Sequence, residues 1–211
     1  EREFETLLNN PESARAVAGR SDLVIVGASG VPIADLERMR FLWRVGSFAP
    51  LVSGNAVIAR GSKETVAILG TDYGGDGQIR EMRLAEPATG ASRLAVSEPG
   101  SVLAPVALAK RNGWRVGSRV ALVAGGRRAE LPVAGLLELS GLARASGGDV
   151  LVTDVFTAGQ LLGKTGFVDR VDVVLDDGVS IETVRRQLER RLPRGLWIEK
   201  PGRAGETAVR M

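Results

Sequence analysis

Two β-prone runs separated by a polar break dominate the hydrophobic pattern of this chain. Residues 45–59 and 64–72 are rich in Val, Ile, Leu and Ala. The break between them, Arg60-Gly61-Ser62-Lys63, contains a glycine that suits a turn. The pattern predicts a hairpin of two long strands, around which the other elements are arranged.

The pattern before the hairpin predicts a helical segment, a short strand and a second helix. Residues 3–20 carry apolar side chains at helical spacing with Pro11 as an interruption, and residues 22–27 form a buried strand. The second helix would follow residues 27–30 and run to position 43. Its apolar face would consist of Ile33, Leu36, Met39, Leu42 and Trp43.

The pattern after the hairpin predicts short strands and helices between glycine- and proline-rich stretches. Pro132 would place one strand at a sheet edge, because proline cannot donate a ladder hydrogen bond. Gly113 and Gly163 would end two helices, and Ser180 would cap a third. We predict strands at 102–103, 119–124, 129–137, 149–153, 168–175 and 196–198, helices at 105–112, 155–162 and 181–192, and a polar helical tail at 203–211.

The composition removes several kinds of chemistry. The 211 residues include neither cysteine nor histidine, which excludes disulfides, tetrahedral zinc sites and Ser-His or Cys-His nucleophilic pairs. Ser62 and Lys63 could form a Ser-Lys pair, but adjacent side chains on an extended chain point apart. We therefore expect no catalytic, cofactor-binding or metal-binding residue and no enzymatic activity.

The charge pattern does not favour nucleic-acid binding. The formal net charge is +3, and only 4% of the residues are aromatic, whereas such sites combine basic clusters with stacking aromatics. The arginines at positions 185, 186, 190, 191 and 194 alternate with Glu189 and are interpreted as a solvated helix face. Arg127 and Arg128 are interpreted as a solvated turn, with contact to a partner or to lipid headgroups as the alternative.

Two sets of residues resemble ligand sites and are given simpler interpretations. Gly27-Ala28-Ser29-Gly30 lies between a strand and a helix, but it lacks the spacing of a phosphate-binding loop and is interpreted as a tight turn. Aspartates at positions 72 and 76 lack calcium-loop spacing. A metal cluster of Asp169, Asp172, Asp176 and Asp177 is disfavoured, because Asp169 and Asp172 would lie on opposite faces of a strand.

The order of elements predicts an α+β fold made of two subdomains. The first and last thirds share buried strands and amphipathic helices, whereas the middle third has short strands and much Gly and Pro. We expect residues 1–73 and 149–211 to form a discontinuous α+β subdomain with an inserted, mostly β subdomain at 74–148. No apolar run is long enough to span a membrane, and because the chain begins at Glu1 without Met we expect it to be an excised segment.

Landmarks distributed over nearly the whole chain follow one another in a characteristic order. They are Phe48-Ala49-Pro50-Leu51, Val57-Ile58-Ala59-Arg60-Gly61, residues 66–72 and 100–105, Ala107-Leu108-Ala109, Gly117-Ser118, residues 133–137 and 168–172, Leu188 and Leu192-Pro193. Taken in order, they resemble the MacB-like periplasmic core domain of FtsX-like ABC transporter permeases. The chain departs from that family at Ser118, where members commonly carry Asp.

This resemblance implies a Porter-like α+β subdomain interrupted by a Sabre-like β-rich subdomain, placed on the periplasmic or extracellular side of a membrane. It also implies a cytoplasmic ABC ATPase and a second permease copy or homologue as partners, with a periplasmic adaptor as an open further partner, but no nucleic acid and no cofactor. The implied function is to transmit ATP-driven movement for export or extraction of a lipophilic or peptide-like substrate. A free-standing extracytoplasmic ligand-binding module, with its cleft between the subdomains, is the alternative.

Overall fold

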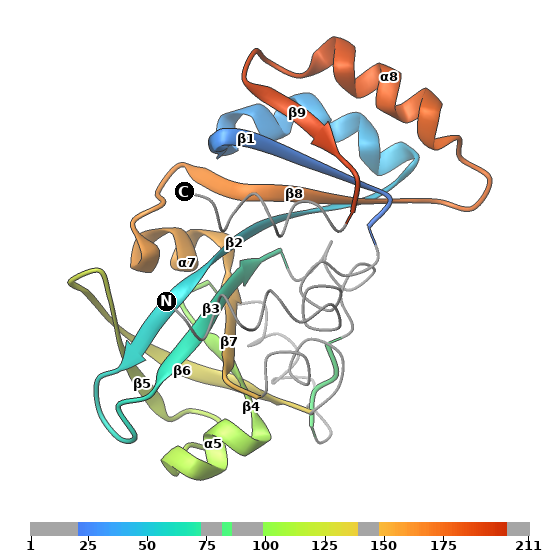
Figure 1. Cartoon of the computed structure of the whole chain (residues 1–211). Coiled ribbons are helices and arrows are strands. Elements are labelled where there is room, and N and C mark those ends of the chain that lie inside the picture. The colour runs from blue at the N-terminus through green and yellow to red at the C-terminus, as the bar shows by residue number, and fades with distance from the viewer. Residues whose placement is uncertain (1–20, 73–81, 86–98, 139–147, 202–211) are drawn as a thin grey trace.

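The computed structural model describes residues 21–72, 82–85, 99–138 and 148–201. Its elements are β1 (Leu23–Pro32), η1 (Ile33–Arg44), β2 (Gly46–Ile58), β3 (Thr65–Thr71), β4 (Val102–Pro105), α5 (Val106–Asn112), β5 (Arg119–Ala124), β6 (Arg127–Leu137), β7 (Val150–Asp154), α7 (Val155–Leu162), β8 (Phe167–Leu175), α8 (Ile181–Arg191) and β9 (Leu196–Glu199). The predicted helix at 3–20, the tail at 203–211 and Asp76 lie outside the described residues. One large sheet with few helices confirms the α+β class (Figure 1).

The strands form two regions that share β2. Within the described residues the order is β3-β7-β4-β6-β5-β2-β8-β1-β9, and β3 also pairs with β2. The extra pairing closes β2, β3, β7, β4, β6 and β5 into what we call the strand ring. The other strands, β8, β1 and β9, continue from the first half of β2 as an open region that we call the helix-covered sheet.

The predicted hairpin is β2 and β3, and β2 belongs to both regions. Its first half, residues 46–51, pairs with β8, and residues 51–57 pair with β3. Alternate positions of the ring strands carry buried apolar side chains. These side chains and the apolar side chains under η1 and α8 form one buried core. Members of this core from the ring strands include Val52, Ile58, Ile68, Leu122, Val133 and Leu151.

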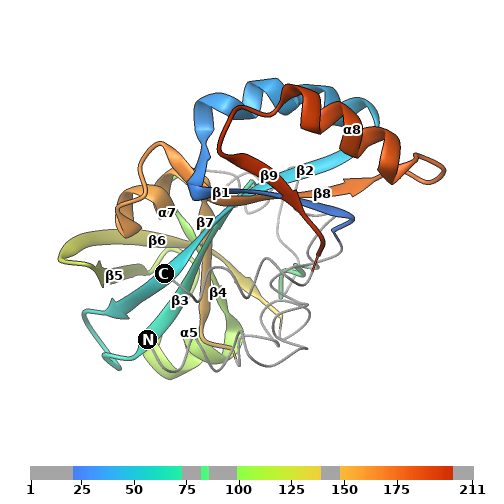
Figure 2. The same ribbon diagram turned by 45° about the horizontal axis from the view of Figure 1, so that its top comes forward.

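Helices cover the two regions differently. η1 and α8 lie side by side on one face of the helix-covered sheet (Figure 2), where Leu42 and Leu188 are fully buried. α5 lies at the end of the ring remote from β8, and α7 lies between the ring and β8 (Figure 1). The predicted helix ends are confirmed, since Gly113 and Gly163 adopt left-handed conformations and Ser180 caps α8.

η1 is a 3-10 helix instead of the predicted amphipathic α-helix. Ile33, Leu36, Met39 and Leu42 recur at intervals of three residues, which matches the three residues per turn of a 3-10 helix. Trp43 therefore leaves the buried face and is 59% exposed, contrary to the prediction. Its ring stacks on Phe48, with the centroids 5.3 Å apart.

The segment 27–30 is not a turn between a strand and a helix, contrary to the prediction. It is an irregularity inside β1, which pairs with β8 up to Val26 and again from Val31. Gly30 has φ +84° and lies so close to β8 that a Cβ atom would be 2.7 Å from Val168 O. Glycine thus permits a bulge there, and the strand resumes before η1 begins.

Strand β6 is not an edge strand, contrary to the prediction from Pro132. It lies between β4 and β5, but pairing with β4 begins only at Val133. Val133 donates its amide to Ser118 on the β5 side, so the nitrogen of Pro132 faces the side that β4 has not yet reached. The proline is tolerated because no ladder hydrogen bond is lost.

The division into subdomains at residues 73 and 149 stays a prediction. Of the described strands of the middle third, β4 pairs with β7 and β5 pairs with the end of β2, while β6 lies between β4 and β5. Hydrogen bonding between strands therefore continues across both predicted limits.

The first and last described strands are neighbours. β1 and β9 pair in antiparallel fashion, with Val24 opposite Glu199. The chain therefore enters β1 and leaves β9 at the same end of the helix-covered sheet. Among the described residues no helix has the length and apolar character needed to cross a membrane.

Candidate functional site at the junction of β2, β8 and α7

Among the described residues, the strand β2 has no strand neighbour on one side at the point where it passes from one region to the other. On that side it pairs with β8 up to Leu51 and with β5 only at Val57 and Ile58. The opposite side is paired with β3 throughout residues 51–57. Backbone groups within this gap need other partners, because buried polar groups without hydrogen bonds are costly.

At Ser53 these partners are two side chains that follow α7 in the sequence, Lys164 and Asp169. The Ser53 amide donates to Asp169 Oδ2 at 2.7 Å, and Lys164 Nζ donates to the Ser53 carbonyl at 2.8 Å. Lys164 and Asp169 also bind each other, with Nζ and Oδ1 2.6 Å apart. These two side chains therefore replace one rung of a β-ladder and connect β8 to the ring part of β2. We call Ser53, Lys164 and Asp169 the junction clamp.

The polar groups of the clamp are engaged with one another and with the backbone of β2. The Ser53 hydroxyl donates to Asp169 Oδ2 at 3.1 Å, so the acidic oxygen is already engaged. The Lys164 amine is directed at that carboxylate and at a backbone carbonyl. Neither group is paired as a nucleophile with a free base.

α7 packs into the same junction through two glycines. A Cβ atom on Gly54 of β2 would lie 2.8 Å from Leu162 Cδ2, and one on Gly70 of β3 would lie 2.2 Å from the Ala158 Cβ. At Gly70 a larger residue would push the helix away from β3, whereas at Gly54 the end of the Leu162 side chain would have to move. Glycine in these strand interiors therefore permits the close approach of α7.

Asp154 holds the beginning of α7. One carboxylate oxygen accepts from the amides of Phe156 and Thr157, as in an N-cap, and the other accepts from the Gly100 amide at 3.0 Å and from the Thr157 hydroxyl. Partial burial alone would raise the pKa of Asp154, but the hydrogen bonds from Thr157, Gly100 and Phe156 lower it. The ionised carboxylate thus joins α7 to the segment that precedes β4.

The β5–β6 hairpin reaches the other end of α7. A Cβ atom on Gly163 would lie 2.7 Å from Arg127 Nη1, so the guanidinium lies directly over the residue that ends the helix. A positive charge at a helix C-terminus is favourable. Arg127 and Arg128 are both exposed, and Arg127 in addition covers the end of α7.

The aspartates that the sequence suggested as a cluster have separate surroundings. Asp169 belongs to the junction clamp, and Asp172 is buried beside Arg170, whose Nε lies 3.2 Å from its carboxylate. Asp176 and Asp177 are exposed in the turn before α8. In the described part of the chain no group of His, Cys, Asp and Glu side chains could hold a metal ion.

The remaining candidates also lie apart from one another. Ser62 and Lys63 are exposed in the β2–β3 turn, where the Ser62 amide donates to Asn112 Oδ1. Asp72 directly follows β3 and is exposed. None of these residues is part of the junction.

Sequence reasoning missed the junction clamp and the glycine contacts of α7. Ser53 is more than a hundred residues from its partners, with a separation of 116 positions from Asp169, so no local pattern links them. Gly54 and Gly70 inside β-prone runs were a usable signal, because such glycines often mark close approach of another segment.

Comparison with known proteins agrees on one family. The family model described as the MacB-like periplasmic core domain matches residues 6–191. An uncharacterised ABC transporter permease protein, Rv0987 of Mycobacterium tuberculosis, is 25% identical over 205 residues, which is 94% of this chain and 23% of that protein. The chain thus spans about a quarter of that relative's length.

Solved structures share the fold at low sequence identity. The periplasmic region of MacB from Actinobacillus actinomycetemcomitans has a TM-score of 0.58 and 11% identity, covering 92% of this chain and 94% of that one. The extracellular domain of the ABC-type transporter YknZ from Gram-positive bacteria has a TM-score of 0.61 and 11% identity, covering 84% and 99%.

Proposed function

This chain belongs to the family of MacB-like periplasmic core domains, and we propose that it transmits ATP-driven movement within an ABC transporter permease. As a member, it is an extracytoplasmic domain of such a permease. We place it on the periplasmic or extracellular face of the cell membrane. Its role there is mechanical and non-catalytic.

The antiparallel pairing of β1 with β9 is the observation that carries this proposal. Because Val24 lies opposite Glu199, the described chain enters β1 and leaves β9 at one end of one sheet, and the connections to the rest of the permease would continue from there. Two adjacent connections to one packed sheet would move that sheet as a rigid body when the attached segments shift.

The junction would carry this movement on to the strand ring. β2 runs unbroken through both regions, and the clamp ties β8 to β2 where their pairing ends. α7 fills the same junction at Gly54 and Gly70. Movement of the helix-covered sheet would therefore reach the ring without a flexible linker at this point.

The partners that this function requires are proposals as well. A cytoplasmic ABC ATPase would supply the movement, and a second permease copy or a homologue would supply the opposing domain. A periplasmic adaptor would be a further partner. The cargo would be a lipophilic or peptide-like molecule that is exported or extracted from the membrane.

The test measures whether the strand ring moves during the ATP hydrolysis cycle of the ATPase. The full-length permease, assembled with its ATPase in a bilayer, would carry a spin label on a non-natural amino acid at position 62, in the exposed β2–β3 turn. We expect the label-to-label distance across the permease pair to differ between the nucleotide-free and the ATP-trapped states. An identical distance distribution in both states would contradict the proposal.

A further inference from the structure

Asn112 and Gly113 form the only Asn-Gly pair in the sequence of 211 residues. They stand at the end of α5, where Gly113 adopts a left-handed conformation with φ +67°. In such a pair the backbone nitrogen of the glycine can attack the side-chain amide carbon of the asparagine. Glycine favours this attack because it has no side chain to hinder the approach. The pair is therefore the position in the chain that is most prone to loss of a side-chain amide.

The Asn112 side chain fastens α5 to the β2–β3 turn. Its Oδ1 atom accepts from the Ser62 amide at 3.1 Å, and its Nδ2 atom donates to the Leu108 carbonyl at 3.1 Å. A Cβ atom on Gly61 would lie 2.8 Å from Oδ1, so the turn passes directly beside the side-chain amide. The side chain of Asn112 is thus held at both of its polar atoms.

The nitrogen of Gly113 is engaged as well. It donates to the Lys110 carbonyl at 3.3 Å, and the following amide, that of Trp114, donates to the Ala109 carbonyl at 2.8 Å. Attack on Asn112 requires the glycine nitrogen to leave its carbonyl and the asparagine side chain to turn away from both of its partners. The native end of α5 therefore opposes the reaction, and local opening of this end permits it.

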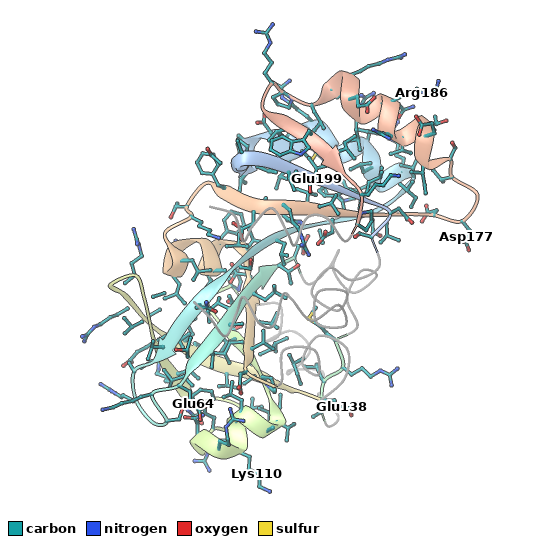
Figure 3. The ribbon with its side chains drawn as sticks, viewed as in Figure 1. Glu64, Lys110, Glu138, Asp177, Arg186 and Glu199 are labelled. Carbon is teal, nitrogen blue, oxygen red and sulfur yellow. The ribbon has the colours of Figure 1, made fainter. Side chains whose placement is uncertain are left out.

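Arg111 holds this end of α5 in place through two ion pairs. Its guanidinium donates to Glu64 Oε2 at 3.1 Å and also binds the carboxylate of Asp149. The helix is thereby joined to the residue that precedes β3 and to the residue that precedes β7. In Figure 3 Glu64 lies between the β2–β3 turn and α5, whereas Lys110 lies on the outer side of the helix. Within the described residues no ion pair engages Lys110.

We propose that Asn112 loses its side-chain amide in a reaction with Gly113 whose rate is set by the undocking of α5. The Gly113 nitrogen forms a bond with Cγ of Asn112, and the bond from Cγ to Nδ2 breaks. Ammonia leaves and takes up the proton of the glycine nitrogen. Water then opens the resulting cyclic imide at either of its two carbonyl carbons, which gives aspartate or isoaspartate at position 112. The reaction needs no partner, so it is independent of the proposed function.

Neither product restores the native end of α5. The aspartate has no N–H group to donate to the Leu108 carbonyl, and its negative charge stands at a helix C-terminus, where the helix dipole disfavours it. The isoaspartate lengthens the main chain by a methylene group, which displaces the Trp114 amide from the Ala109 carbonyl. Because Leu108 and Ala109 are buried in the core, a loosened α5 weakens this end of the strand ring.

The first experiment compares the reaction of Asn112 in the folded and in the unfolded 211-residue chain. Peptide mapping by mass spectrometry measures the conversion to aspartate and isoaspartate in one buffer, with and without urea. We expect the folded chain to react at least about tenfold more slowly, because only its locally open fraction reacts. Equal rates, or no conversion in the unfolded chain, would overturn the proposal.

The second experiment tests whether undocking of α5 sets the rate. Arg111→Ala should raise the rate in the folded chain by about fivefold, because two partly exposed ion pairs are lost while alanine still favours the helix. Lys110→Ala is the matched control, since it removes the same charge from the neighbouring position and should leave the rate unchanged. Equal acceleration by both changes, or none by Arg111→Ala, would contradict control by undocking.

The third experiment tests the consequence of the reaction. Asn112→Asp reproduces one product, and we expect the Trp114 amide to exchange with solvent deuterium about fivefold faster in this variant, because a hydrogen bond at the end of α5 is lost. Asn55→Asp makes the same change in β2 and should leave the exchange of Trp114 as it is. Unchanged exchange in Asn112→Asp would show that the modification does not loosen α5.

Discussion

Removal of the Asp154 carboxylate should destabilise the whole domain, because this side chain joins α7 to the segment before β4. Asp154→Ala removes the N-cap bonds to Phe156 and Thr157, which typically contribute about 1 kcal/mol. It also removes the charge-assisted bonds from Gly100 and the Thr157 hydroxyl, worth about 2 kcal/mol together in this half-buried place. A loss of about 3 kcal/mol corresponds to a fall in Tm of about 6–12 °C for a chain of this size.

Asp154→Asn is the matched control for this prediction. Asparagine is a good N-cap, but its amide group cannot accept from both Gly100 and Thr157 in place of the second carboxylate oxygen. We expect a fall in Tm between that of the Ala variant and the wild type, measured by circular dichroism at pH 7. A fall below about 2 °C for Asp154→Ala would refute the reasoning.

The pH dependence gives an independent check of the same group. Its folded pKa lies below the ordinary value of 3.8, so its contribution is fully present above that value and is lost as the pH falls through the folded pKa. The stability difference between wild type and Asp154→Asn should therefore shrink as the pH is lowered below 4. A constant difference from pH 7 to pH 2.5 would show that the charge of Asp154 contributes nothing.

Other substitutions test the packing around the junction and η1, each by thermal or denaturant unfolding of the 211-residue chain. Gly70→Ala should cost about 2 kcal/mol or more, because the new Cβ would lie 2.2 Å from Ala158 Cβ; adding Ala158→Gly should recover part of the loss, and no recovery would mean that the clash lies elsewhere. Leu42→Ala should cost about 3 kcal/mol and Trp43→Ala about 1 kcal/mol, because Leu42 is fully buried and Trp43 is 59% exposed; the reverse order would contradict the three-residue repeat of η1. Lys164→Met should lower the free energy of unfolding by about 1–2 kcal/mol, because the amine bridges a carboxylate and a backbone carbonyl. Unchanged stability would show that the junction clamp does not stabilise the fold.

Most local elements could be predicted from the sequence because their signals are local. The glycine at 61 marked the hairpin turn, Gly113 and Gly163 marked two helix ends, and Ser180 marked the start of α8. Each of these residues acts within a few positions of itself. The order of such elements also carried the family resemblance, which the match of the family model to residues 6–191 confirms.

The closure of the ring and the junction clamp could not be predicted in this way. Strand β7 lies between β3 and β4, which are far from it in sequence, and periodicity alone does not choose strand neighbours. In the sequence Lys164 and Asp169 resemble ordinary surface charges, because only the fold brings Ser53 of β2 beside them. The 3-10 geometry of η1 was visible as a repeat of three, but that repeat also fits one face of a short α-helix.

The central claim is that the junction transmits movement as a rigid connection, and one cysteine pair tests it directly. Ser53→Cys with Asp169→Cys replaces contacting side chains, whose oxygens are 3.1 Å apart, by thiols that oxidation can join. In the assembled permease with a label at position 62, we expect the oxidised protein to keep the nucleotide-driven change in distance and the reduced protein, which lacks the polar clamp, to lose much of it. A full response in the reduced protein and none in the oxidised one would show that the junction is a hinge, and would contradict this account.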